Sequence, residues 1–250
     1  MIKTTLLLLA SLVTSLMADE RALALLRQGD ALDAAMKTPE ALAKYLEAEK
    51  ITPNDASLLH RIAKQYGESM NDAKTAEGQR DFATKALEVS KRAVAADPAN
   101  PQAQVALAIS YGRLAPFLEN KQKIAYSKLV KEHAEKALAL DDKCELAHHV
   151  LGAWNYELAG FGMLMRALVK LTYGGLPEAS YAAAEKHFLK GCELNPRRLA
   201  NFVELGRTYQ KLEKPAEARK NLEKGLALPS IYRDDEATKE RARAALKELE

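Results

Sequence analysis

AHHVLGAWNYELAG, the stretch at residues 147–160, shows most clearly how this chain folds. Four of its residues are separated by steps of 3, 1 and 3, which places them on one face of an α-helix. They are His148, Leu151, Gly152 and Asn155. The third of them is glycine, and a small residue there lets a neighbouring helix approach closely. The stretch therefore predicts a helix that packs tightly against a second helix.

The same spacing recurs in three other segments, as a large, an apolar and a small residue followed by tyrosine. These segments contain Leu59, Ile62, Ala63 and Tyr66; Gln104, Leu107, Ala108 and Tyr111; and Phe202, Leu205, Gly206 and Tyr209. A second motif places a small residue five positions before a turn-forming residue. The turn-forming residues are Pro53, Pro98, Asp142, Pro196 and Ser230. Two motifs that alternate in this way indicate an internal repeat.

These motifs divide the chain into five repeats that resemble the tetratricopeptide repeat, a pair of antiparallel helices. The repeats are 22–55, 56–100, 101–144, 145–198 and 199–232. The middle three are longer than the 34-residue first and last repeats by 11, 10 and 20 residues, which we expect between their two helices. A polar helix is expected at 234–249. We therefore predict an all-α solenoid of about five helix pairs, with an inserted helix and a C-terminal capping helix.

The first 18 residues, MIKTTLLLLASLVTSLMA, predict a secretory signal peptide. Lys3 precedes an uncharged core of about 14 residues, shorter than the roughly 20 that a membrane-spanning helix needs. Ala18 suits the cleavage site, whereas Leu16 is larger than usual there, so an uncleaved anchor is the alternative. We expect the mature domain, 19–250, to be exported to the periplasm or secreted, without a transmembrane segment.

Three segments of these repeats resemble the regulator of microtubule dynamics family. They are ISYGRLAPFLENKQKIAYSKLVKEHAEKALALDD, AHHVLGAWNYELAG and LPEASYAAAEKHFLKGCELNP, and the resemblance runs from about Leu59 to Leu228. The second segment together with the LPEAS turn is its most specific part. The resemblance implies an all-helical repeat protein associated with microtubules or membrane contact sites. For some members it also implies a repeat domain that binds phospholipid.

The sequence contains no nucleophile elbow, P-loop, zincin or C-x-x-C motif. Glu145 and His148 form one Glu-x-x-His pair, whereas a di-iron bundle needs two such pairs and two further glutamates. We therefore expect a core or interface role for His148, and neither enzyme activity, a cofactor nor a metal. Cys144 and Cys192 lie at the two ends of the fourth repeat, which antiparallel helices bring together. They form either a disulfide or two ordinary buried thiols.

The first helix of each repeat is expected to line a concave groove. Its positions beside the core face carry four Lys or Arg and two His against two Glu, which makes the groove mildly basic. This pattern indicates either a solvated face or a site for an acidic peptide, a chain carboxylate or a lipid headgroup. The residues expected to contact a partner are His60, Lys64, Arg113, His149, Tyr156, Arg207 and Lys211.

The insertion in the fourth repeat, GFGMLMRALVKLTYGGLPEAS at 160–180, predicts a further helix over 161–173. Arg166 and Lys170 lie opposite its apolar face, and both are expected to point outward or to reach acidic neighbours. The helix is too short to span a bilayer. Its apolar face either packs on the solenoid, which we expect, or stays exposed as a partner or membrane surface. The apolar residues are Phe161, Leu164, Met165, Leu168, Val169 and Leu171.

We therefore expect a non-enzymatic scaffold that binds a protein or peptide partner through the groove. The alternatives are a phospholipid-binding or lipid-transfer module, which requires a continuous apolar cavity, and a microtubule-associated regulator, as in the resembled family. The 250 residues carry a net charge of only +3, from 37 basic and 34 acidic residues, so nucleic acid is not expected as a partner.

Overall fold

A computed structural model describes residues 2–250, and the side chains of residue 17 and residues 19–250. The predicted signal peptide, residues 1–18, lies almost entirely outside the described side chains, so it stays a prediction. No helix in the part of the chain that the structure describes is long and apolar enough to cross a bilayer.

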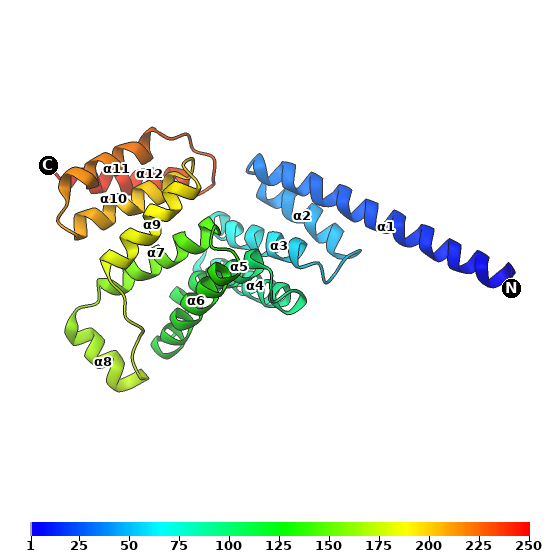
Figure 1. Cartoon of the computed structure of the whole chain (residues 1–250), viewed down its shortest axis with the longest axis horizontal. Coiled ribbons are helices and arrows are strands. Elements are labelled where there is room, and N and C mark those ends of the chain that lie inside the picture. Colours follow the sequence, from blue (N-terminus) through cyan, green and yellow to red (C-terminus); the bar gives the residue numbers. More distant parts are fainter. Residues whose placement is uncertain (1) are drawn as a thin grey trace. The chain divides into compact units, whose positions relative to one another are not determined.

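The chain divides into two compact units, residues 1–106 and 107–250, called unit 1 and unit 2 below. All secondary structure in residues 2–250 is helical (Figure 1). Unit 1 contains α1 (Ile2–Ala34), α2 (Thr38–Glu49), α3 (Ala56–Ser69), α4 (Ala76–Ala96) and the start of α5 (Pro101–Leu114). Unit 2 contains the rest of α5, then α6 (Asn120–Leu140), α7 (Glu145–Ala159), α8 (Met163–Tyr173), α9 (Tyr181–Leu194), α10 (Leu199–Lys211), α11 (Pro215–Ala227) and α12 (Asp235–Lys247).

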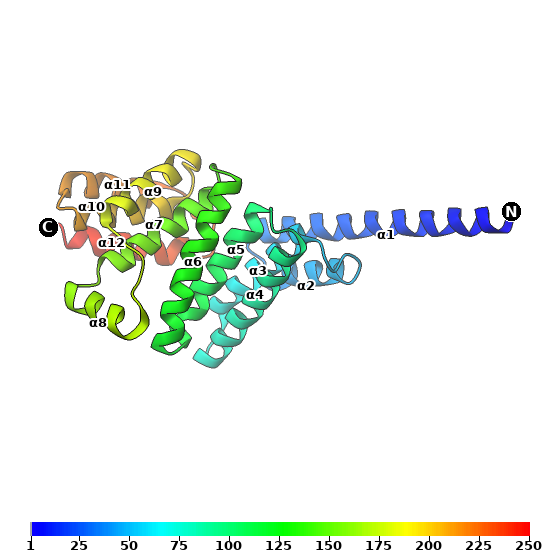
Figure 2. The ribbon, with the colours of Figure 1, turned by 60° about the horizontal axis from the view of Figure 1, so that its bottom comes forward.

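The five predicted helix pairs are confirmed. The repeats correspond in chain order to the end of α1 with α2, α3 with α4, α5 with α6, α7 with α9, and α10 with α11. The inserted helix, α8, lies between the two helices of the fourth pair, and α12 follows the fifth pair, where the capping helix was predicted. Helices α7 and α9 lie side by side in Figures 1 and 2, as do α10 and α11.

The extra length of the second and third repeats is not placed as predicted. Helices α4 and α6 each have 21 residues, compared with 12 in α2 and 13 in α11. Most of the additional residues therefore lengthen the second helix of the pair. A short 3-10 turn, Met70–Asp72 or Ala115–Phe117, precedes each long helix.

Small residues at the predicted positions allow the helices of a pair to pack closely. A Cβ atom added to Gly152 would lie 2.7 Å from the ring of Phe188, which is fully buried in α9. A Cβ atom at Gly206 would lie 2.7 Å from the side chain of Leu222 in α11. Because only glycine leaves room for these side chains, the backbones of the paired helices can approach each other.

Turn residues between the repeats also cap the following helices. Asp55 precedes α3, and its carboxylate accepts hydrogen bonds from the backbone N–H groups of Ser57 and Leu58 at 2.8 and 3.1 Å. Asn100 precedes α5 and accepts in the same way from Gln102 and Ala103. Such caps satisfy N–H groups that have no partner within the helix, so they fix where each helix begins.

Candidate functional site

The predicted groove residues are divided between the two units. His60 and Lys64 belong to α3 in unit 1. The other five, from Arg113 to Lys211, belong to α5, α7 and α10 in unit 2.

In unit 1 the two predicted groove residues carry little free positive charge. The Lys64 ammonium lies 2.7 Å from a carboxylate oxygen of Asp33 and 3.0 Å from one of Glu68. His60 has a buried Nδ1 without a hydrogen-bond partner. Burial, followed by the adjacent Arg61 guanidinium, lowers the pKa of His60 to about 4. At neutral pH this face of α3 therefore presents a neutral imidazole and a compensated ammonium group.

In unit 2 a charged cluster joins α7, α10 and α12. Glu204 in α10 lies 2.6 Å from Arg207 and 3.5 Å from Arg241, which belongs to α12. The Arg207 guanidinium lies 4.9 Å from the ring centre of Tyr156 in α7, a cation–π arrangement. We call Tyr156, Glu204, Arg207 and Arg241 the Glu204 cluster. It contains two positive charges and one negative charge.

Beside this cluster, a partly buried chain of hydrogen bonds links α7 to α10. The imidazole Nδ1 of His149 donates to the side-chain oxygen of Asn201 at 2.8 Å, and the Asn201 amide donates to the Glu145 carboxylate at 2.6 Å. Asn201 is completely buried and packs against Gly191, where an added Cβ would lie 2.9 Å from it. The chain of hydrogen bonds therefore fixes the orientation of the His149 ring.

Burial of the His149 ring, followed by the nearby Arg198 guanidinium, lowers the pKa of His149 to about 4. Burial also raises the pKa of the Tyr156 hydroxyl. Both side chains are therefore uncharged at neutral pH. The charge of the Glu204 cluster comes from Glu204, Arg207 and Arg241.

The remaining predicted groove residues lie in the last turns of two inner helices. Arg113 is half-buried near the end of α5, and Lys211 is exposed at the end of α10. Three apolar residues on the same helices, one or two turns from the predicted groove residues, are buried. These are Val105, Ala200 and Val203. Val203 shows the physical reason, because it packs against Gly225 of α11 and so belongs to the core of the pair.

Sequence reasoning missed four residues of this face: Glu145, Asn201, Glu204 and Arg241. A signal for Glu204 was present, because it lies three positions before Arg207 on the same helix. No comparable signal pointed to Arg241, because it lies on α12, which was predicted only as a capping helix. The close packing of α12 on α10 brings Arg241 to Glu204.

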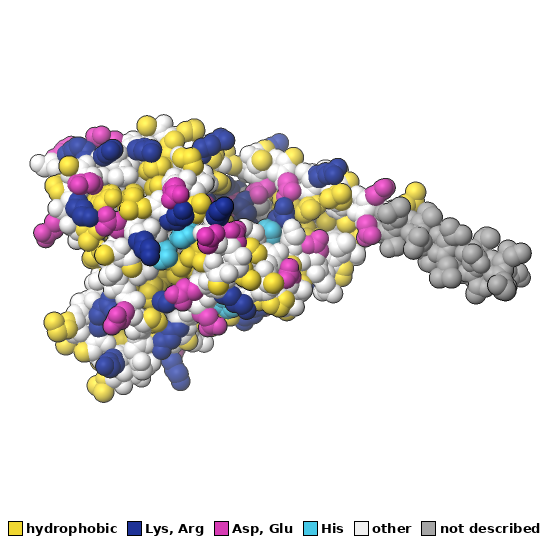
Figure 3. Space-filling model, viewed as in Figure 1, with side chains coloured by type: hydrophobic (Ala, Val, Ile, Leu, Met, Phe, Trp, Pro, Cys, Tyr) yellow, Lys and Arg dark blue, Asp and Glu magenta, His cyan; other side chains and the backbone are white. Residues whose placement is uncertain are grey.

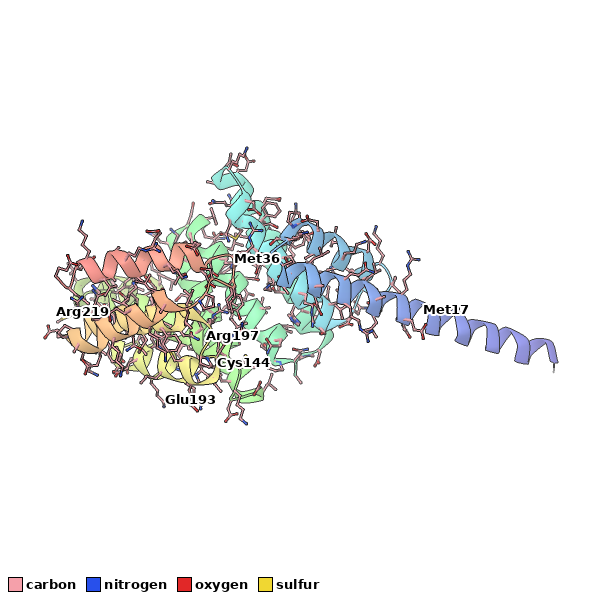
Figure 4. All side chains as sticks on the ribbon, turned by 90° about the horizontal axis from the view of Figure 1, so that it is seen from above. Met17, Met36, Cys144, Glu193, Arg197 and Arg219 are labelled. Carbon is pink, nitrogen blue, oxygen red and sulfur yellow. The ribbon has the colours of Figure 1, made fainter. Side chains whose placement is uncertain are left out.

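The disulfide that was considered between Cys144 and Cys192 is not formed, and both cysteines are free. Cys144 is buried at the start of α7, and Figure 4 labels it together with Glu193 and Arg197, which lie at the end of α9 and in the following turn. Cys192 instead packs against the apolar cluster around Phe188 and Leu205. Cys144 is therefore a buried free thiol, and Cys192 is a half-buried one.

We expect both thiols to react fully with an alkylating reagent after unfolding without reductant. Burial raises the pKa of Cys192 to about 12, so in the folded chain this thiol should react far more slowly than a free thiol. Mass spectrometry of folded and unfolded samples measures both effects. Recovery of a linked peptide that contains both cysteines would contradict the prediction.

The inserted helix does not pack as predicted, because most of its apolar side chains are exposed. Met163, Leu164 and Leu171 are 88, 86 and 87% exposed. In α8 only Val169 is buried. The expectation for Arg166 is also wrong: its guanidinium turns inward and donates to the backbone carbonyls of Leu158 and Phe161 at 2.5 and 3.0 Å.

A pocket of about 220 Å³ lies in unit 1, lined by residues of α1, α2 and α3 and by the turn before α3. Its wall combines apolar side chains with the carboxylates of Asp19 and Asp55. A wall that includes two carboxylates is a poor match for an acyl chain. This pocket therefore does not match the continuous apolar cavity that a lipid carrier requires.

Comparison with known sequences gives matches over most of the chain. The family model described as Regulator of microtubule dynamics protein 1-3 matches residues 25–250. Regulator of microtubule dynamics protein 1 of Bos taurus is 30% identical over 201 residues, which are 80% of this chain and 62% of that protein. Protein 3 of Xenopus laevis is 27% identical over 87% of this chain and 48% of its own length. The chain thus spans less than two thirds of these relatives.

Comparison with solved structures identifies the same fold. A thermophilic tetratricopeptide-repeat protein of Thermus thermophilus superposes with a TM-score of 0.65 at 18% identity, covering 90% of this chain and 99% of that one. PilF of Pseudomonas aeruginosa gives a TM-score of 0.56 at 16% identity and 93% coverage of both chains. At such low identity the likeness concerns the fold, which is that of a tetratricopeptide-type α-solenoid.

Proposed function

Because the chain belongs to the regulator of microtubule dynamics protein 1-3 family and folds as a tetratricopeptide-type solenoid, we propose that it is a non-enzymatic scaffold. In this proposal, the inner face of unit 2 binds a peptide segment of a protein partner. Stacked helices of this kind present an extended surface on which side chains from successive helices can contact one ligand.

The observation that carries this proposal is the Glu204 cluster. Two guanidinium groups share the Glu204 carboxylate, and both stay partly accessible, with side-chain exposures of 27% for Arg207 and 47% for Arg241. Arg207 is also held over the ring of Tyr156, so its position is fixed before a ligand binds. Arginine and tyrosine contribute strongly to binding at protein interfaces. An acidic side chain or a terminal carboxylate of the partner is the complementary group.

Substitution of the arginines tests this assignment. We expect Arg207→Gln and Arg241→Gln each to weaken binding of an acidic peptide by about ten- to a hundredfold, since a hydrogen bond to a charged group contributes about 1.5–3 kcal/mol. The measurement is fluorescence anisotropy with labelled decapeptides that carry one to three glutamates and a free or amidated C-terminus. Glutamine is preferred to a charge reversal, because a new carboxylate at residue 207 would face Glu204.

Arg243→Gln is the matched control for Arg241→Gln. It lies on the same helix two residues further on, its side chain is 52% exposed, and it pairs with Glu240. We expect Arg243→Gln to bind the peptides as the parent chain does. Equal losses in all three variants, or no binding of any acidic peptide by the parent, would overturn the proposal.

The names of the relatives indicate a second candidate, binding to microtubules. Co-sedimentation with stabilised microtubules, using the same three variants, tests it directly. If the chain sediments and Arg241→Gln weakens the association, microtubules use the proposed face. If the chain does not sediment, this candidate is excluded and the peptide-binding proposal is still tested by anisotropy.

A further inference from the structure

The inserted helix α8 presents its apolar side chains away from the protein. Leu164 and Leu171 are seven positions apart and share one side of the helix, whereas the buried Val169 lies about 140–160° around the axis from them. Leu168, at 55% exposure, and Met163 flank the outer side. Figure 3 shows hydrophobic side chains on the surface of this helix. Its orientation is thus the reverse of that of an ordinary surface helix, whose apolar side faces the core.

Two features hold α8 in this orientation. Arg166 reaches inward to the backbone carbonyls of Leu158 and Phe161 and so ties the first turns of α8 to the end of α7. At the other end, Gly174 and Gly175 have φ values of 75° and 86°, a left-handed conformation that glycine adopts without strain and that ends the helix sharply. The outward apolar face is therefore built into the fold of unit 2.

Exposed lysines border this face, while the acidic Glu157 and Glu178 lie beyond the two ends of the insertion. Between residues 158 and 177 the only charged residues are Arg166 and Lys170, and Lys170 is exposed. The first turns of α6 lie beside α8 in Figures 1 and 2, and the first twelve residues of α6 contain four lysines and no acidic residue. Three of these lysines are exposed: Lys121, Lys123 and Lys128. An apolar face bordered by lysines is complementary to an anionic lipid surface.

The size of the face argues against a second copy of the chain as the occupant. Eleven residues at about 1.5 Å each give a helix about 17 Å long, with an outer face on the order of 200 Å². A stable protein–protein interface buries about 800 Å² on each partner. A bilayer has no such requirement, because each apolar side chain that enters the acyl region contributes separately.

We propose that α8 docks on the surface of an anionic lipid bilayer. The helix lies in the plane of the interface, with Leu164, Leu168 and Leu171 among the acyl chains. Lys170 and the exposed lysines of α6 contact the phosphate and carboxylate groups of the lipids. This proposal concerns a different surface from the Glu204 cluster and does not depend on the peptide-binding proposal.

A tryptophan placed in α8 of the full-length chain tests the proposal locally, whatever residues 1–18 do at a membrane. We expect the added emission of Leu164→Trp to shift to the blue on vesicles of phosphatidylcholine and phosphatidylserine in a three-to-one mixture. Brominated acyl chains in the same vesicles should quench it. Native Trp154 is buried and gives a constant background. The matched control is Leu189→Trp in α9, where the parent leucine is 45% exposed and no quenching is expected.

Two further measurements keep the proposal falsifiable. A chain with Leu168→Ser and Leu171→Ser in addition to Leu164→Trp should lose the quenching but keep its melting temperature, because these side chains are exposed. Omitting phosphatidylserine should weaken the quenching strongly. Emission of Leu164→Trp that is unquenched on anionic vesicles would overturn the proposal. So would equal quenching on neutral vesicles, or dimerisation in solution that the two serines abolish.

Discussion

Replacing Phe188 with alanine should lower the free energy of unfolding of unit 2 by about 3–5 kcal/mol. The ring is fully buried, and it packs against Ala184, Leu205 and Tyr209. It also fills the space above Gly152, so its loss leaves a cavity between α7 and α9 that neighbouring side chains cannot fill. The measurement is urea unfolding followed by the fluorescence of Trp154, the only tryptophan of the chain, which is buried in unit 2.

Two companion variants show whether the contact with Gly152 is responsible. Gly152→Ala alone should cost about 1–3 kcal/mol, because the new Cβ would lie 2.7 Å from a ring that cannot move away. In a chain that already carries Phe188→Ala, Gly152→Ala should cost much less, because the effects of substitutions at contacting residues on the free energy of unfolding are not additive. Leu189→Ala is the control, with 45% exposure and an expected effect within about 0.5 kcal/mol. Additive losses in the double variant would mean that the helices are not packed through this pair.

Acidification should also destabilise the folded chain, between about pH 6.5 and pH 4. Burial lowers the pKa of His60, His149 and His187 to about 4, whereas an exposed histidine has a pKa of about 6.5. Between these values the unfolded chain binds protons that the folded chain does not. Protonation therefore favours unfolding as the pH falls through this window, and the stability contributed by the neutral rings is complete above it.

His149→Asn isolates one of these contributions. Asparagine retains an N–H donor near the position of the imidazole Nδ1, so the bond to Asn201 can persist, but it does not titrate. The decline in the free energy of unfolding from pH 7 to pH 4 should be smaller in the variant by on the order of 1–3 kcal/mol, since one pKa unit corresponds to about 1.36 kcal/mol. Parallel stability curves for variant and parent would show that the ring titrates normally.

The number and order of the helices could be predicted from the sequence, whereas the lengths of α4 and α6 were not. The spacing of Leu151, Gly152 and Asn155 defines a helical face, and Asp55 and Asn100 mark where helices begin. These signals involve residues only a few positions apart, so they can be recognised without knowledge of the rest of the chain. Even α8 was predicted closely. Its predicted start is two residues before the observed one, and its predicted end at residue 173 is correct because Gly174 and Gly175 end the helix.

The charges near the predicted partner-binding residues were predicted only in part, because they depend on residues that are distant in the sequence. Lys64 was expected to supply positive charge, but Asp33, 31 positions earlier, compensates it. Arg207 was predicted, whereas its cluster is completed by Arg241, 37 positions beyond Glu204. Net charge along one helix therefore does not determine the charge of the surface that several helices form together.

The sequence by itself determined that this chain is a row of helix pairs, because the period and the caps of each helix are local properties. It also determined that α8 has an apolar face and two cations. Only the tertiary structure decided that Val169 is buried while Leu164 and Leu171 point to the outside. The physical reason is that hydrophobic periodicity states which side of a helix avoids water, but the connections at both ends and the hydrogen bonds of Arg166 decide which side meets the protein.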